Sequence, residues 1–253
     1  MNFFFGMKHL NFHSEIQIPC FQNRNPKSKK LLLYEAWTEN NQWVINRLND
    51  CKLNDDFYIV KNNNINNKKI FFLANEKDID QFNNKKLKNF NNFTDTAPAF
   101  RSNFKIFIKD GGFSSYQSEY PFSMVCKEGS IISSVSSIGN IDAEKNYIII
   151  RNILEEPKEE KFNAYLVDIK EKKIKEKIEI KTNFTNFFEL SSFLIKPEIF
   201  LITDKFLGIP IYMSIKNKHI SFEHTHPPHE YILSKNKFEK ITQLKKEIHE
   251  IIS

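Results

Sequence analysis

The chain has 253 residues and a net charge of +6 at pH 7, and lysine, asparagine, isoleucine and phenylalanine supply 120 of the residues. These four types have A/T-rich codons, so the composition indicates an A/T-rich genome, and runs of asparagine or lysine carry little functional information. With 14% aromatic residues, 6 Gly and 9 Pro, the composition excludes collagen-like and low-complexity chains, and no apolar stretch reaches the roughly 18 residues of a membrane span.

The basic charge does not point to a nucleic-acid partner. Lysine outnumbers arginine 33 to 4, whereas proteins that recognise nucleic acids favour arginine for bidentate and stacked contacts. The lysines also alternate with acidic residues, as in residues 170–177. We therefore expect no nucleic-acid partner.

The cysteines and the N-terminus favour a cytoplasmic protein. Cys20, Cys51 and Cys126 are odd in number and far apart, which does not fit a disulfide framework. The apolar run Phe3-Phe4-Phe5 is too short for a secretory signal peptide. The Asn-Phe-Thr sequons at Asn92 and Asn183 are then interpreted as chance products of asparagine abundance.

Residues 1–96 are predicted to form a small α+β region. The apolar runs 57–60 and 70–73 flank a polar connection and predict a hairpin. After Asn75, a candidate N-cap, apolar residues follow at roughly helical spacing. The small polar stretch 94–98, which contains Pro98, is the candidate boundary.

Residues 97–233 are predicted to form an antiparallel β-sandwich, Ig-like or jelly-roll-like, which makes the protein mainly β. Phe104, Ile106 and Ile108 alternate with Lys105, Phe107 and Lys109, a period typical of strands. Strand-like runs then recur without intervening helices, mostly 10 to 15 residues apart, at 120–126, 131–138, 146–153, 163–169, 173–181, 198–203, 209–216 and 219–224. The runs 148–150 and 199–202 are apolar on both faces, which predicts central strands.

Residues 234–253 are predicted to form an amphipathic helix that packs on the rest of the protein. Ser234 can serve as its N-cap. Residues at helical spacing form one apolar stripe, namely Phe238, Ile241, Leu244, Ile248 and Ile251 or Ile252.

The segment 113–122 is a candidate ligand-binding loop. Aromatic rings stack on the apolar faces of sugars, while hydroxyl, amide and carboxylate groups hydrogen-bond to their hydroxyls. The residues predicted to bind a saccharide or another small polar ligand are Phe113, Tyr116, Gln117, Glu119 and Tyr120. The alternative is that the loop only covers a sheet edge.

The segment 223–230 concentrates side chains that could bind a metal. His224 and His226 project from the same face of a strand, where two imidazoles can chelate one divalent ion, and Glu230 could complete the site, with His229 nearby. The order His-x-His-x-x-x-Glu resembles the first metal-binding motif of the cupin barrels. This resemblance implies two His and one Glu as ligands of iron, manganese, zinc or nickel. The alternative is a polar strand exit that Pro227 and Pro228 stiffen.

Three functional hypotheses follow. The first is a non-enzymatic β-sandwich protein that binds a saccharide or glycoconjugate. The second is a cupin-like metal-dependent enzyme with Zn, Fe or Mn at His224, His226 and Glu230. The third is a structural or partner-binding module, which includes a homo-oligomer.

Overall fold

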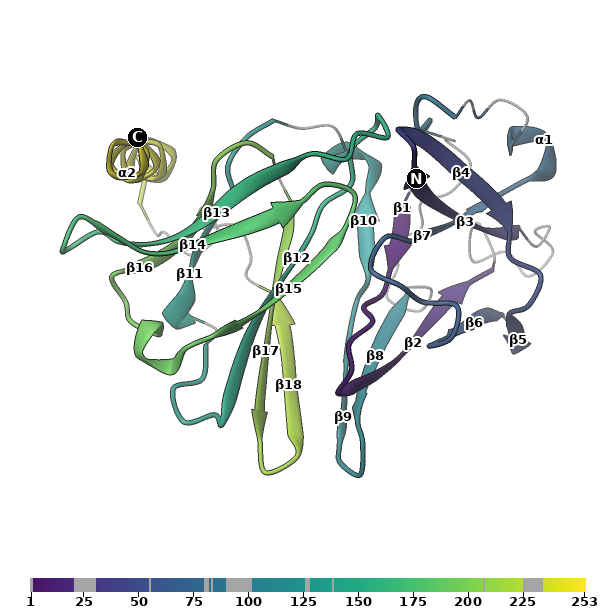
Figure 1. Ribbon diagram of the computed structural model, residues 1–253, viewed down its shortest axis with the longest axis horizontal. Coiled ribbons are helices and arrows are strands. Elements are labelled where there is room, and N and C mark those ends of the chain that lie inside the picture. Colours follow the sequence, from purple (N-terminus) through teal and green to yellow (C-terminus); the bar gives the residue numbers. More distant parts are fainter. Residues whose placement is uncertain are drawn as a thin grey trace. The chain divides into compact units, whose positions relative to one another are not determined.

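The fold was analysed in a computed structural model (Figure 1), which describes residues 2–253 except 21–30, 55, 80, 81, 83, 90–101, 126, 127, 138, 207 and 225–233. The chain divides into two compact units. Unit 1 comprises Met1–Cys126, Ile153–Glu159 and Thr182–Thr185, and unit 2 comprises Lys127–Asn152, Glu160–Lys181 and Asn186–Ser253.

The first sheet of unit 1 is antiparallel and holds much of that unit's core. Its order is β10 (Glu119–Pro121), β1 (Asn2–Phe5), β7 (Ile70–Ala74), β3 (Leu32–Glu39) and β4 (Gln42–Arg47). Strands β1 and β7 are buried throughout, since both faces carry apolar side chains. The rings of Phe3 and Phe72 meet edge to face, with centroids 5.9 Å apart.

The second sheet of unit 1 has one buried and one more exposed face. Its order is β5 (Lys52–Asn54), β6 (Phe57–Lys61), β2 (Phe12–Pro19), β8 (Asn103–Ile108) and β9 (Phe113–Tyr116), all antiparallel. In β2, Phe12, Ser14, Ile16 and Ile18 are buried, whereas the residues between them are exposed or half-buried. This period of two defines an inner and an outer face.

Two later segments of the chain are bound into unit 1 by hydrogen bonds. Thr185, the first residue of β15 (Thr185–Leu190), donates its backbone N–H to Asn67 and its hydroxyl to the carbonyl of Gly6. The indole N–H of Trp43 donates to the carbonyl of Glu155 over 2.9 Å. These bonds satisfy polar groups that burial would otherwise leave unpaired.

Unit 2 contains two four-stranded antiparallel sheets. One has the order β11 (Ile132–Ser134), β16 (Ile199–Thr203), β13 (Lys161–Asp168) and β14 (Lys173–Lys181). The other has the order β15, β12 (Lys145–Arg151), β17 (Ile209–Lys216) and β18 (His219–His224). The described residues also include three short 3-10 helices, η2 (Phe122–Met124), η3 (Val135–Ser137) and η4 (Ser192–Leu194). The two runs predicted as central strands are confirmed, because β12 and β16 each have a neighbour on both sides.

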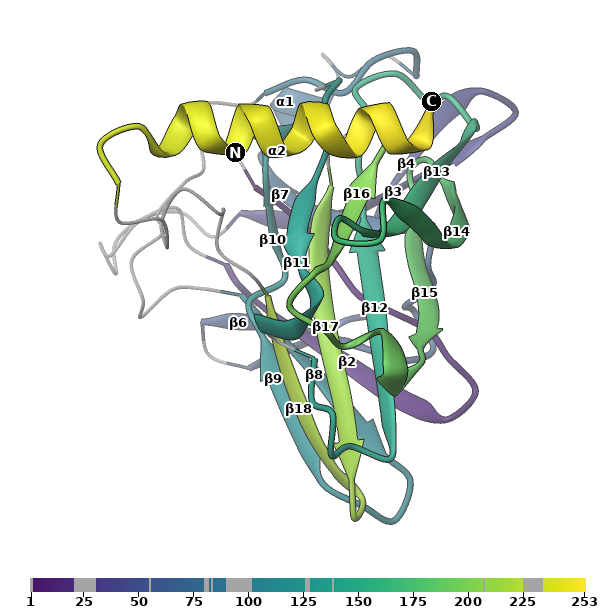
Figure 2. The same cartoon turned by 90° about the vertical axis from the view of Figure 1, so that its left-hand side faces the viewer.

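The predicted C-terminal helix is confirmed as α2 (Lys237–Ile252), and Figure 2 shows it running across the strands of unit 2. Its buried Ile248 packs with Ile132, Val167 and Ile202 of β11, β13 and β16. Asn236, rather than Ser234, is the N-cap residue, and its side chain makes no capping hydrogen bond. Apolar packing therefore holds this helix against the sheet.

The prediction of one sandwich over 97–233 is wrong. Strand β8 of that region pairs with β2 and with β9, and β10 pairs with β1, so the region contributes strands to all four sheets. The strands of the described residues form four small antiparallel sheets. The spacing of strands along a chain indicates their number but not their partners, which is why the prediction failed.

The described residues of the predicted α+β region form the strands β1 to β7 and the four-residue helix α1 (Glu76–Ile79), so strands dominate it. The strands predicted as a hairpin exist as β6 and β7, but β6 pairs with β2, and β7 with β1 and β3. The predicted boundary at 94–98 lies outside the described residues.

Candidate functional site

The five residues predicted to bind a saccharide do not share one surface. Tyr120 is fully buried and its hydroxyl donates to the carbonyl of Met124, so it is part of the core. Glu119 accepts hydrogen bonds from the side-chain amide of Gln117 at 2.6 Å and from the backbone N–H of Ser102 at 3.1 Å. These bonds organise the ends of β9 and β10. Tyr116 lies on the inner face, opposite Phe104 in the register.

Phe113 belongs instead to a row of rings on the outer face of the second sheet. The register places His13 of β2 opposite Phe107 of β8, and Phe107 opposite Phe113 of β9. The ring centroids lie 6.4 Å apart for His13 and Phe107, and 5.5 Å apart for Phe107 and Phe113. Phe113 is 61% exposed. We call His13, Phe107 and Phe113 the aromatic row.

A row of polar side chains lies beside the aromatic row on the same face. Two residues away from the aromatic row on each strand, Ser115 lies opposite Lys105, and Lys105 lies opposite Glu15. Glu15 in turn lies opposite Lys61 of β6. The Gln17 amide donates to Glu15 over 3.1 Å. We call Ser115, Lys105, Glu15 and Lys61 the polar row. A carboxylate between two ammonium groups gives this row charges of both signs.

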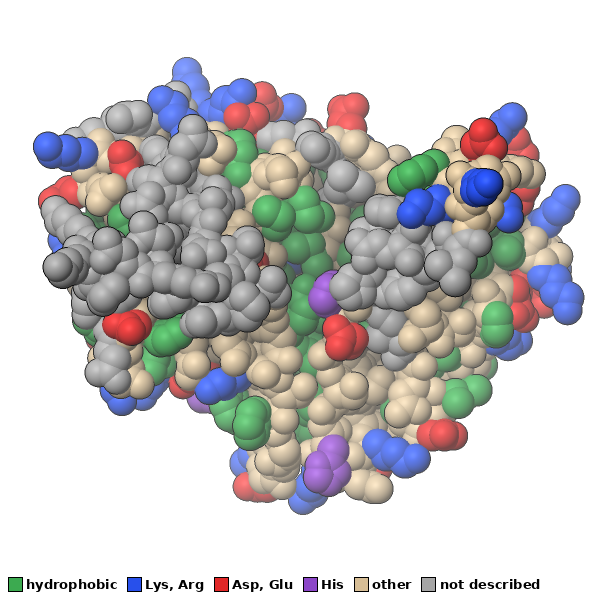
Figure 3. All heavy atoms as spheres, turned by 180° about the vertical axis from the view of Figure 1, so that it is seen from behind, with side chains coloured by type: hydrophobic (Ala, Val, Ile, Leu, Met, Phe, Trp, Pro, Cys, Tyr) green, Lys and Arg blue, Asp and Glu red, His purple; other side chains and the backbone are tan. Residues whose placement is uncertain are grey.

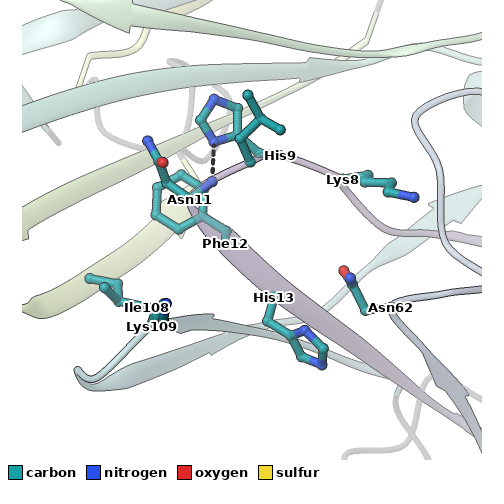
Figure 4. A pocket seen from close by; sticks show the side chains of 9 residues that line it. Lys8, His9, Asn11, Phe12, His13, Asn62, Ile108 and Lys109 are labelled. Atoms are coloured by element: carbon teal, nitrogen blue, oxygen red, sulfur yellow. Dashed lines mark hydrogen bonds between the residues drawn. The ribbon is translucent and has the colours of Figure 1, made fainter.

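The end of the same sheet carries a surface hollow of about 760 Å³ (Figure 4). Its lining comes from three segments: residues 8–13, Asn62 after β6, and residues 108–109 at the end of β8. In Figure 4, Lys8 and Asn62 lie on one side of it and Lys109 on the other, with His13 between them. His13 therefore belongs to both the aromatic row and the hollow.

The lining of the hollow is mixed. It contains two lysines, two histidines and two asparagines beside the apolar Leu10, Phe12 and Ile108, and no carboxylate. A second hollow of unit 1, about 450 Å³, is lined by Asn41, Lys85, Lys86, Glu156, Pro157 and Lys158. There Lys86 pairs with Glu155 and Lys158 with Glu156, at 3.0 and 2.8 Å. Over the described part of the face seen in Figure 3, acidic and basic side chains are interspersed, whereas the charged side chains that line the first hollow are basic.

The predicted metal ligands lie mostly outside the described residues. His224 ends β18, and its Nδ1 lies 3.1 Å from a carboxylate oxygen of Glu223. His226, His229 and Glu230 fall within 225–233, which the structure does not describe. In the described part of the chain, no three His, Cys, Asp or Glu side chains are grouped so that they could hold a metal ion.

Comparisons with protein-family models, with curated proteins and with solved structures found no match to this chain. None of the helices in the described residues is long and apolar enough to cross a membrane. The site must therefore be interpreted from its own geometry.

Proposed function

We propose that this protein is a non-enzymatic binding protein that recognises a saccharide or glycoconjugate on the outer face of the second sheet of unit 1. The observation that carries the proposal is the aromatic row, three rings aligned across β2, β8 and β9 and turned away from the core. Large apolar rings on an outer face are functional candidates because burial would otherwise favour them inside.

The two rows together suit a polyhydroxylated ligand. The ring faces can pack against the C–H face of a sugar, and the polar row offers a hydroxyl, two ammonium groups and a carboxylate to its hydroxyls. The alternation of charge at Lys105, Glu15 and Lys61 disfavours a polyanion lying along the face, since Glu15 would repel it.

The polar row supports binding rather than turnover. Most glycoside hydrolases place two carboxylates across the scissile bond. The polar row holds one, Glu15, and the side-chain amide of Gln17 is bonded to it.

The test is a glycan array probed with the whole protein, followed by calorimetry on the glycans that bind. Phe107→Ala and Phe113→Ala should each weaken binding about fivefold or more, because a nucleic-acid base stacked on one aromatic ring, a comparable contact, gains about 1–3 kcal/mol. The matched control is Phe193→Ala, which removes an equally exposed phenylalanine (69%) from unit 2. Equal binding by all three variants, or no glycan bound at all, would reject the proposal.

We also propose the reducing cytoplasm as the compartment, and the odd number and wide spacing of Cys20, Cys51 and Cys126 support it. The metal-dependent enzyme stays a prediction, because His226, His229 and Glu230 are not described.

A further inference from the structure

We infer that the hollow at the end of the second sheet binds an acidic group, so that the saccharide carries a carboxylate such as that of a uronic acid. This inference rests on the proposed saccharide binding. It names the class of saccharide, and it follows from the charges that line the hollow.

The cationic groups of the hollow are not neutralised by the protein. Among the described residues, Lys8 and Lys109 make no ion pair through their ammonium groups, and no carboxylate lines the hollow. Unpaired ammonium groups on both sides of one concave surface attract an anion.

The backbone and amide groups around the hollow are held in place. The side-chain oxygen of Asn62 accepts from the backbone N–H of Ser14 at 3.2 Å, which leaves the amide N–H₂ of Asn62 available to a ligand. The backbone of Lys8 is fixed at both its N–H and its carbonyl by the side-chain amide of Asn67. A donor set on a fixed backbone loses less entropy when an anion binds.

The position of the hollow links it to the aromatic row. His13 lines the hollow and is also the first ring of the row, where it meets Phe107 at an interplanar angle of 66°, so a sugar packed on Phe107 beside His13 would hold its substituent at the hollow. The hollow would bind an oxyanion in either of two forms, as the acidic group of a sugar or as a free inorganic anion. An experiment can distinguish the two.

The experiment compares matched saccharides by calorimetry at low salt, using the whole protein. Each pair consists of a di- or trisaccharide that ends in glucuronic or galacturonic acid and the same compound ending in glucose or galactose; sodium sulfate is the third probe. The acidic member should bind about tenfold more tightly, because two ammonium groups near one carboxylate add a modest attraction in water. This advantage should shrink in 150 mM salt, where charges are screened.

Variants test whether the preference for the acidic saccharide comes from the hollow. Lys8→Gln and Lys109→Gln should each reduce the preference for the acidic member and leave binding of the neutral one unchanged. Lys52→Gln, an exposed lysine of β5 outside the hollow, should keep the preference.

Two failures can be told apart. If acidic and neutral members bind equally, the inference is overturned and the proposed saccharide binding stands. If neither member of any pair binds, the proposed function fails and the inference with it. Binding of sulfate alone, lost in Lys8→Gln, would then identify the hollow as a site for free anions and would overturn the acidic saccharide.

Discussion

Replacing Asn183 should destabilise unit 1 more than any nearby polar substitution. Asn183 is 1% exposed and has a positive φ of 52°. Its side-chain oxygen accepts from the backbone N–H of Leu154 at 2.7 Å, and its amide donates to the carbonyls of Glu156 and Lys158 at 3.4 and 3.2 Å. One side chain thus holds two segments of unit 1 together, 153–159 and 182–185.

Asn183→Ala should lower the free energy of unfolding by about 3 kcal/mol. A buried donor that loses its acceptor costs about 1–3 kcal/mol, and the Leu154 N–H would lose one. Alanine also pays about 1 kcal/mol or more for a left-handed backbone, which asparagine tolerates better. Asn183→Gly removes the same hydrogen bonds but adopts a positive φ easily, so it should cost about 1 kcal/mol less than alanine.

Tryptophan fluorescence is the appropriate assay, because both tryptophans of the chain, Trp37 and Trp43, lie in unit 1. Trp43 also donates to Glu155 of the segment that Asn183 binds. Urea titrations give the free energy of unfolding of the wild type, Asn183→Ala and Asn183→Gly. A change below about 0.5 kcal/mol for alanine, or a glycine variant less stable than alanine, would refute the reasoning.

Two further substitutions test buried and half-buried charges. Lys69→Met should lower the free energy of unfolding by about 3 kcal/mol in the same assay, because the mostly buried Glu35, 2.7 Å away, loses its partner. The double variant with Glu35→Gln should recover much of this loss. Fully additive effects of the two substitutions would contradict this. The pKa of Asp168 is lowered by the backbone N–H that Glu171 donates to it and by the Lys175 ammonium. Ionised Asp168 therefore stabilises the fold above the ordinary pKa of 3.8, and this stabilisation is lost as the pH falls below that value. The stability gap between wild type and Asp168→Ala, measured by circular dichroism, should therefore narrow below pH 4; a constant gap would reject this.

The strands could be predicted from the sequence better than their pairing. Alternation marked β8, and continuous apolar runs marked β12 and β16 as central strands. Pairing depends on contacts between residues far apart in the chain, such as Phe4 with Phe71 and Phe3 with Tyr120. Local periodicity contains no information on such pairs, so the sheets could not be assigned.

Asparagine abundance was interpreted as codon bias, but some asparagines have a conformational role. Asn40 and Asn41 form the two-residue turn between β3 and β4, and both have positive φ, at 51° and 54°. The turn between β17 and β18 likewise has positive φ at Asn217 and Lys218. Such turns match the twist of the paired strands and favour asparagine or glycine. With only 6 glycines in the chain, asparagine takes three of these four positions.

The candidate site could be predicted only in part. Phe113 was named as a ligand residue, and the signal for Phe107 was present, since it alternates with buried residues and shares its face with two lysines. His13 was missed because β2 was not predicted. Its alternation of Phe12, Ser14 and Ile16 would have placed His13 on the outer face.

Stability measurements separate a binding role of the aromatic row from a structural one. Phe113 is 61% exposed and has one cross-strand ring partner, so alanine there should cost about 1 kcal/mol or less. Tyr120, predicted for the same site, is fully buried, and its truncation should cost about 3–5 kcal/mol. Loss of binding in a Tyr120 variant would therefore reflect damage to the core. Loss of binding in Phe113→Ala with nearly unchanged stability has no such explanation, and it would place the ligand on the aromatic row.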